Sequence, residues 1–218
     1  MNDLFLLQTP LFHGLSAEDA KKLLHCLGAE KKSFDKDCII YHAGDTVKRI
    51  GLVLSGSVNI ESVDFLGNKS ILSHAGPGQL FAETYAFLGD EPLMVSVAAA
   101  EQSKVLFLSI EQLLTTCPEA CTCHTAMIKN LLTVSARKNI SLSQKILHIS
   151  PKSIRERLLA YLSTLSAQQG SRSVTIPFNR QQLADYLCVD RSALSNEISK
   201  MKKEGIIKAE KNKFFLQS

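Results

Sequence analysis

The chain has 218 residues, 45% of them hydrophobic, and a formal net charge of +4, which is ordinary for a globular protein of two small domains. Its first residues lack the basic start and apolar core of a signal peptide, and no later run is long enough for a membrane span, so we expect a cytoplasmic protein. In that compartment the six cysteines are expected to be reduced thiols.

The first 33 residues are predicted to be helical. The stretch Ser16–Asp19 has the form of a capping box, with Asp in place of the usual Glu at its last position. Gly28 can end this helix, because glycine readily adopts the left-handed conformation found after a helix. The buried face is expected to consist of Leu23, Leu24 and Leu27.

Short apolar runs alternate with turn residues from residue 34 to about residue 108. Runs spaced roughly eight to twelve residues apart, with glycine at the corners, indicate an antiparallel barrel or sandwich. The stretch Phe81–Gly89 interrupts the strands and is expected to form a short helical turn. A closed barrel of this size leaves an interior suited to one small ligand.

A long helix is predicted over about residues 110–148, with a pause near Cys117-Pro118. A helix of this length usually needs a partner along its apolar stripe. We expect that partner to be the same helix of a second subunit. Packing against the chain's own barrel is the alternative, and both can hold on different faces. The stripe consists of Met127, Ile128, Leu131, Val134 and Leu142.

Ser150-Pro151 marks the predicted domain boundary, since a residue before proline is disfavoured in a helix, whereas serine can cap and proline can begin the next one. Residues 1–149 would form a sensor domain, and residues 150–218 a second domain that opens with a helix from Lys152 to about Ala167. The first segment has 13 Lys and Arg against 15 Asp and Glu, and the second has 12 against 6. A basic surplus confined to the second segment suits binding to a polyanion.

Residues 176–203 have the features of a helix-turn-helix. Asn179 can cap a first short helix and Asp190 a second, longer one. Ala184 lies where the two helices approach closely, a place that requires a small side chain. Two short strands around an Asn-containing turn are expected at residues 206–216, as a wing behind the second helix. The inward positions are Leu183, Tyr186 and Leu187 in the first helix and Leu194, Ile198 and Met201 in the second.

The outward side of the second helix carries polar and basic side chains that can bind base edges or phosphates, so we predict a DNA-reading surface there. Arg191 is the best candidate for a guanine or phosphate contact, and Lys203 is a further candidate for phosphate. Two amphipathic helices that merely share a tight turn are the plainer alternative. The predicted DNA-binding residues are Arg180, Gln181, Arg191, Ser192, Ser195, Asn196, Lys200 and Lys202.

The order of these parts, a glycine-cornered barrel, a long helix and a winged helix-turn-helix, resembles the CRP/FNR family of bacterial transcription regulators. Three stretches are similar to the barrel signatures of that family: Ala43-Gly-Asp, Leu54-Ser-Gly-Ser-Val and Gly76-Pro-Gly-Gln-Leu-Phe. Two more are similar to its DNA motif: Arg180-Gln-Gln-Leu-Ala-Asp-Tyr-Leu and Asp190-Arg-Ser-Ala-Leu-Ser. The resemblance covers nearly the whole chain.

This resemblance implies an α+β fold in which an N-terminal antiparallel β-barrel of the cyclic-nucleotide-binding, jelly-roll type precedes a dimerisation helix and a C-terminal winged helix-turn-helix. It also implies a homodimer that binds double-stranded DNA at a roughly palindromic operator, is controlled by a small effector and works with RNA polymerase. A ligand-binding module with a vestigial DNA domain is a rival interpretation.

The family's effector motif is altered in this chain. Members that bind cyclic nucleotides hold the ribose with a Gly-Glu pair and the phosphate with an arginine ten residues later; here Ala82-Glu83 keeps only the carboxylate, and Leu93 occupies the arginine position. We therefore predict that cyclic AMP does not bind tightly. A different polar or anionic effector is one possibility, and surface or interface roles for the same residues are the other. The candidate effector residues are Glu83, Thr84, Leu93, Met94, Lys138 and Asn139.

Cys117, Cys121, Cys123 and His124 form the one stretch that favours a redox or metal sensor, which is our alternative for the signal. Cys121 and His124 share a helix face, but the spacing is one residue short of a c-type haem motif. Buried thiols that behave as small hydrophobic groups are the simpler interpretation. We assign no metal ligands, and the cofactor stays unknown.

An enzyme is not expected. The sequence shows no Gly-rich phosphate loop, nucleophile elbow or pair of catalytic carboxylates.

Overall fold

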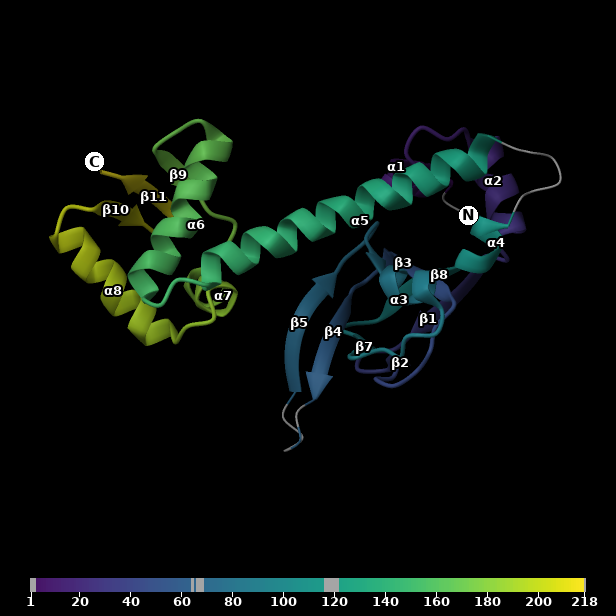
Figure 1. Cartoon of the computed structure of the whole chain (residues 1–218), viewed down its shortest axis with the longest axis horizontal. Coiled ribbons are helices and arrows are strands. Elements are labelled where there is room, and N and C mark those ends of the chain that lie inside the picture. The colour runs from purple at the N-terminus through teal and green to yellow at the C-terminus, as the bar shows by residue number, and fades with distance from the viewer. Residues whose placement is uncertain (1–2, 64, 66–68, 116–121, 218) are drawn as a thin grey trace. The chain divides into compact units, whose positions relative to one another are not determined.

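The computed structural model describes residues 3–63, 65, 69–115 and 122–217. The chain divides into two compact units, residues 1–136 and residues 137–218. The long helix α5 (Thr122–Ile149) contributes residues to both (Figure 1). Within the described residues, no helix is both long and apolar enough to cross a membrane.

The N-terminal unit contains two four-stranded antiparallel sheets, with strand orders β1-β8-β3-β6 and β2-β7-β4-β5. This architecture confirms the antiparallel barrel or sandwich that the sequence predicts. The strands are β1 (Glu30–Phe34), β2 (Ile39–Tyr41), β3 (Arg49–Ser55), β4 (Val58–Val63), β5 (Lys69–Ala75), β6 (Leu80–Phe81), β7 (Ser96–Ala99) and β8 (Ser103–Ser109).

An aromatic cluster occupies the interior of this unit. Phe81 of β6 and Phe107 of β8 are buried in one apolar cluster with valines of β3, β4, β7 and β8. Tyr41 of β2 contacts both rings edge-on, at centroid distances of 6.2 and 5.8 Å. Gly51 of β3 makes room for Phe81, because a Cβ at that position would lie 2.1 Å from the ring. Aromatic side chains from both sheets therefore pack together in the interior of this unit.

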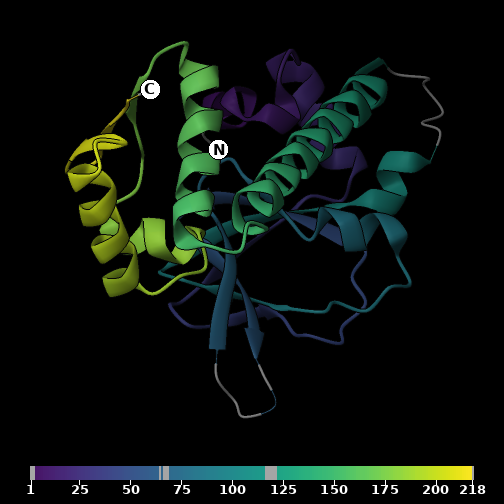
Figure 2. The same ribbon diagram turned by 60° about the vertical axis from the view of Figure 1, so that its left-hand side comes forward.

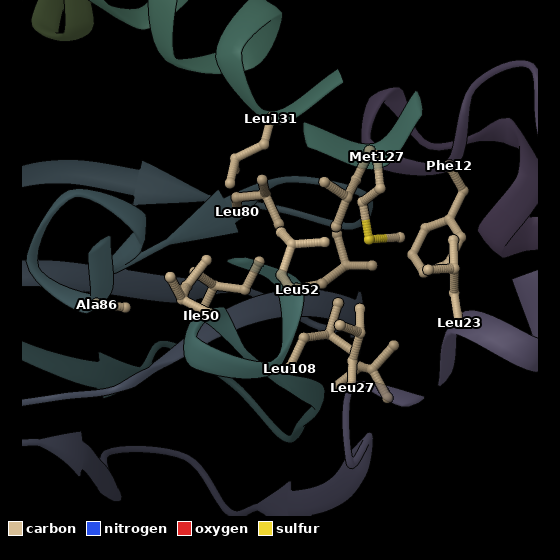
Figure 3. Packing of buried hydrophobic residues seen from close by; sticks show 14 of the residues in the cluster. Phe12, Leu23, Leu27, Ile50, Leu52, Leu80, Ala86, Leu108, Met127 and Leu131 are labelled. Atoms are coloured by element: carbon tan, nitrogen blue, oxygen red, sulfur yellow. The ribbon is translucent and has the colours of Figure 1, made fainter. Parts of the chain in front are cut away.

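A second apolar cluster contains residues of β3 and β8 together with several helices (Figure 3). Leu52 of β3 and Leu80 of β6 belong to it together with Met127 and Leu131 of α5. The first part of α5 thus packs against its own chain, as the sequence allowed. The other helices of the unit are α1 (Asp3–Gln8), the 3₁₀ turn η1 (Pro10–Phe12), α2 (Ala17–Cys26), α3 (Glu83–Leu88) and α4 (Ile110–Leu114).

One helix prediction needs correction. The first helical segment ends at Cys26, and residues 30–33 belong to β1, an edge strand whose exposed side chains give no strand-like alternation. The helix predicted from Ile110 with a pause consists of two described parts: α4, which ends at Leu114, and α5, which begins at Thr122. The predicted pause at Cys117-Pro118 lies outside the described residues.

The C-terminal unit is a helical cluster with a small antiparallel sheet of order β10-β11-β9. The pair β10–β11 confirms the predicted wing, and a third strand, β9, pairs with β11. The elements after α5 are α6 (Ile154–Gln169), β9 (Ser173–Thr175), α7 (Arg180–Tyr186), α8 (Arg191–Lys203), β10 (Ile207–Glu210) and β11 (Lys213–Leu216).

The start of α6 also differs from the prediction. Ser153 is the N-cap, because its side chain accepts from the amide of Glu156 while the Glu156 carboxylate accepts from the amide of Ser153. Ser150 instead donates its hydroxyl to the carbonyl of Ile146 at 2.6 Å. This reciprocal capping box places the start of α6 at Ile154, two residues after the predicted Lys152.

Candidate nucleic-acid interface

Both helices of the helix-turn-helix begin at the caps that the sequence predicts. The Asn179 side chain accepts from the amide of Gln182 at 2.9 Å, and the Gln182 side chain accepts from the amide of Asn179 at 2.9 Å. The Asp190 carboxylate accepts from the amide of Ala193 at 2.8 Å and from the hydroxyl of Ser192. These hydrogen bonds hold the pKa of the Asp190 carboxyl below its usual value. The starting point of α8 is therefore fixed by local bonds.

The turn between α7 and α8 is held from a third helix. Cys188 has a φ of 53°, in the left-handed region where glycine is the usual residue. Arg157 of α6 donates through Nη1 to the carbonyls of Leu187 and Cys188, both at 3.1 Å, and through Nε to the carbonyl of Pro151 at 2.8 Å. A charged donor thus satisfies the carbonyls of this strained turn.

The apolar side of α8 is buried as predicted. Leu194, Ile198 and Met201 lie in one core cluster with Leu183 and Ala184 of α7. Since the apolar stripe faces inward, the opposite side of the helix faces water. Five of the predicted DNA-binding residues of α8 are exposed and Ser195 is half-buried; the exposed ones are Arg191, Ser192, Asn196, Lys200 and Lys202.

The two residues of α7 that are predicted to bind DNA contact other residues of the protein. The Arg180 guanidinium lies 5.5 Å from the centroid of the Phe214 ring in the wing, and burial lowers the pKa of Arg180. Gln181 donates to the carboxylate of Asp185 at 2.8 Å. Arg180 therefore connects α7 to the wing through a cation–π contact. Its predicted contact with a DNA phosphate stays a prediction.

The position of the family's arginine holds a buried leucine, and the backbone of that leucine is hydrogen-bonded to a neighbouring segment. Leu93 is buried in the core, its amide donates to the carbonyl of Asp45 at 2.9 Å, and its carbonyl accepts from the amide of Gly44 at 2.7 Å. Met94 and Thr84 are exposed, whereas Glu83 is buried at the start of α3. The structure places no cation at the position where the family motif has its arginine.

The last two candidates, Lys138 and Asn139, are neighbours on α5. Lys138 is half-buried and Asn139 is exposed. They belong to the C-terminal unit and the other four candidates to the N-terminal unit. A joint effector site made from both groups stays a prediction.

Comparison with known proteins identifies both units. Residues 31–119 match the family model of the cyclic nucleotide-binding domain, and residues 156–217 match the model of the Crp-like helix-turn-helix domain. The chain belongs to the CRP/FNR family of transcription regulators. Its C-terminal unit is accordingly a DNA-binding helix-turn-helix domain.

Similar proteins cover almost the whole length of this CRP/FNR regulator. The cyclic AMP receptor protein of Thermus thermophilus is 24% identical over 200 residues, which is 92% of this chain and 88% of that protein. The probable transcriptional regulator flp of Lacticaseibacillus casei is 26% identical over 200 residues, 91% of this chain and 87% of that protein. The solved structure of CprK complexed with OCPA shares the fold, with a TM-score of 0.67, 17% identity and coverage of 92% of each chain.

The cysteines of this CRP/FNR regulator do not gather in the described part of the chain. Cys123 is buried in the apolar core with Met127, while Cys26, Cys38 and Cys188 are exposed. Among the described residues, no three Cys, His, Asp or Glu side chains lie close enough to hold a metal ion. The other two candidates, Cys117 and Cys121, lie outside the described residues. The redox or metal alternative stays a prediction.

His148 joins the end of α5 to the helix-turn-helix, a role that the sequence did not suggest. Its Nδ1 lies 2.9 Å from the Tyr186 hydroxyl of α7, and its Nε2 lies 2.9 Å from the Thr164 hydroxyl of α6. The ring packs edge-on against Tyr161 at a centroid distance of 5.4 Å. Burial lowers the pKa of His148, so the folded unit favours the neutral imidazole.

Arg155, Arg157 and His148 are the important residues of the C-terminal unit that sequence analysis missed. Each acts between helices, so its spacing along its own helix carries no signal. One clue was present for Arg155. Glu197 is an acidic residue within an otherwise basic helix that is predicted to read DNA, and such a carboxylate favours a nearby cation.

The neutral state of His148 predicts a pH-dependent stability. In the unfolded chain, His148 becomes protonated as pH falls below the ordinary pKa of 6.5. In the folded chain its pKa is lower, so protonation needs a more acidic solution, and between the two pKa values the unfolded state binds more protons. The free energy of unfolding should therefore be highest above pH 6.5 and should fall as pH decreases through this window. Urea unfolding of the wild type and of His148→Gln between pH 5 and 7 measures the effect, and an equal pH dependence of both would contradict it.

Proposed function

We propose that the protein is a homodimeric, effector-responsive regulator that reads a palindromic operator with α8 and acts on RNA polymerase. The observation that carries the proposal is the orientation of α8. Its N-terminus is capped by Asp190, its apolar side is buried, and its polar, basic side is exposed. A transcription regulator works where the chromosome is, so we place it in the cytoplasm.

Reading of DNA is assigned to the first two turns of α8. In helix-turn-helix proteins the second helix enters the major groove with its N-terminal residues toward the base edges. Arg191, Ser192 and Asn196 lie on that part of α8 and are exposed. Lys200 and Lys202, farther along, suit phosphates. Arg191 has the planar fork that binds guanine in a bidentate way, and we assign it the main specific contact.

The second subunit is assigned to α5. The part of α5 that follows Leu131 exposes five large apolar side chains, far more than a helix in water normally shows. A parallel copy of the same helix would cover them, and two copies would place two α8 helices at half-sites about one helical turn apart. The exposed side chains are Leu132, Ile140, Leu142, Ile146 and Leu147.

The effector is proposed not to be cyclic AMP. A cyclic phosphate that enters the N-terminal unit near Leu93 would meet a buried isobutyl group in place of a guanidinium. Its desolvation would be uncompensated, which costs several kcal/mol. Glu83 and Lys138 are the polar candidates for a different small effector, and a signal through Cys117, Cys121 and Cys123 is the alternative.

The DNA contact of Arg191 can be measured directly. Selection on random duplexes should enrich a palindromic sequence, and Arg191→Ala should then lose about 1–3 kcal/mol on that sequence while discrimination at one base position relaxes. Fluorescence anisotropy on the selected site and on single-base variants tests this. An equal loss on every sequence would make Arg191 a phosphate contact instead.

The dimer interface can be tested by adding charge to α5. The double variant Leu142→Glu/Ile146→Glu, at side chains that are 63% and 60% exposed, should sediment as a monomer, because the carboxylates would be buried between two helices. Leu4→Glu is a matched control on α1, where the side chain is 71% exposed. A monomeric wild type in sedimentation velocity would refute the proposed interface.

The absence of tight cyclic AMP binding is a calorimetric prediction. Titration of cyclic AMP into the protein should give a dissociation constant weaker than about 1 μM, since the phosphate finds no paired cation. The cyclic AMP receptor protein of Thermus thermophilus serves as the positive control in the same buffer. A submicromolar constant for this protein would overturn the assignment.

A further inference from the structure

One guanidinium of α6 binds a carboxylate of α8 and the carboxylate of its C-cap residue, Glu204. Arg155 donates through Nε to Glu197 Oε1 at 2.6 Å, and through Nη1 and Nη2 to Glu204 Oε2 and Oε1 at 2.7 and 3.0 Å. Hydrogen bonds from Arg155 lower the pKa of the Glu204 carboxyl. The bidentate pair is the geometrically specific form of arginine–carboxylate contact.

The two carboxylates lie at separate points along the same side of α8. Seven residues separate Glu197 from Glu204, which is close to two helical turns and about 10 Å along the axis. A contact at one point leaves a helix free to turn or slide about it. Contacts at two points, both made by one planar group, restrict the rotation and the axial position of α8 together.

Apolar packing holds α8 against α6 without a directional bond between them. The helices α6 and α8 lie side by side (Figure 2), and Leu158 of α6 shares a core cluster with Leu194 and Ile198 of α8. Packed side chains favour one arrangement of the two helices, and the directional bonds from Arg155 add to that preference.

The three side chains are only partly exposed to water. Arg155, Glu197 and Glu204 are 33%, 18% and 46% exposed, and a bidentate network is the geometry in which such ion pairs can contribute to stability. The same bonds, made at two points along α8, also orient the helix.

We propose that Arg155 is a positioning residue for DNA reading: it sets the rotation and the axial position of α8, so that Arg191 and Asn196 meet the base edges in register. Glu197 and Glu204 are the parts of α8 that it holds. This inference rests on the proposed function, because it requires that α8 reads DNA.

The test compares binding to the operator with binding to a scrambled duplex. Arg155→Gln in the full-length protein should weaken binding to the selected operator about tenfold and binding to the scrambled duplex less than about threefold, since base contacts need register and phosphate contacts tolerate its loss. Arg155→Lys keeps the charge but lacks the fork, and it should also lower the ratio of the two affinities. Lys152→Gln is the matched control on an exposed cation nearby, and it should leave the ratio unchanged.

A further variant separates positioning from charge. Arg155→Gln/Glu197→Gln/Glu204→Gln removes the two carboxylates that Arg155→Gln leaves unpaired beside the DNA. A ratio that stays low in this variant supports positioning, whereas a ratio restored to the wild-type value would show that Arg155 only neutralises charge and would overturn the proposal. Scrambled-duplex binding together with circular dichroism reports whether each variant is folded.

The outcomes distinguish this inference from the proposed function. If the wild type enriches no sequence from random duplexes, the reading function fails, and the role of Arg155 fails with it. If the wild type enriches an operator and Arg155→Gln keeps the wild-type ratio, only the role of Arg155 is overturned.

Discussion

The burial of one side of α8 is the constraint on which the DNA-binding unit depends. Leu194, Ile198 and Met201 enter the core, and this leaves a single side of the helix for contact with another molecule. Hydrophobic burial selects that side, but it does so without directional preference. The cap at Asp190 fixes where the helix begins, and hydrogen bonds from α6 fix how it is placed. Apolar and polar contacts thus have separate tasks: the first choose the face, and the second set its register.

The same division explains why α6 matters for a surface to which it does not belong. Arg155 reaches the middle and the end of α8, and Arg157 holds the turn before it. His148 connects α5 to the helix-turn-helix, because its ring is hydrogen-bonded to the hydroxyl of Tyr186 in α7. The end of α5 is thus bonded directly to the first helix of the helix-turn-helix. The N-terminal unit is built differently. Phe81 and Phe107 pack in its interior, and the family's arginine position holds a buried leucine.

Much of this could be predicted from the sequence because the signals are local. The caps at Asn179 and Asp190, the apolar stripe of α8 and the wing all follow from residues a few positions apart. Elements with weak local signals were misjudged. The edge strand β1 has exposed polar side chains that give no alternation. The helix predicted from Lys152 begins at Ile154, because Ser153 and Glu156 form the capping box.

The sequence by itself determined the family, the order of the two units and the side of α8 that faces outward, since caps, turns and the helical period depend on near neighbours in the chain. Only the tertiary structure decided what holds α8 in place, because Arg155, Glu197 and Glu204 come together across up to 49 positions of sequence. It also decided that Leu93 is a core residue with its backbone bonded to Gly44 and Asp45, a contact between segments that no pattern along the chain relates.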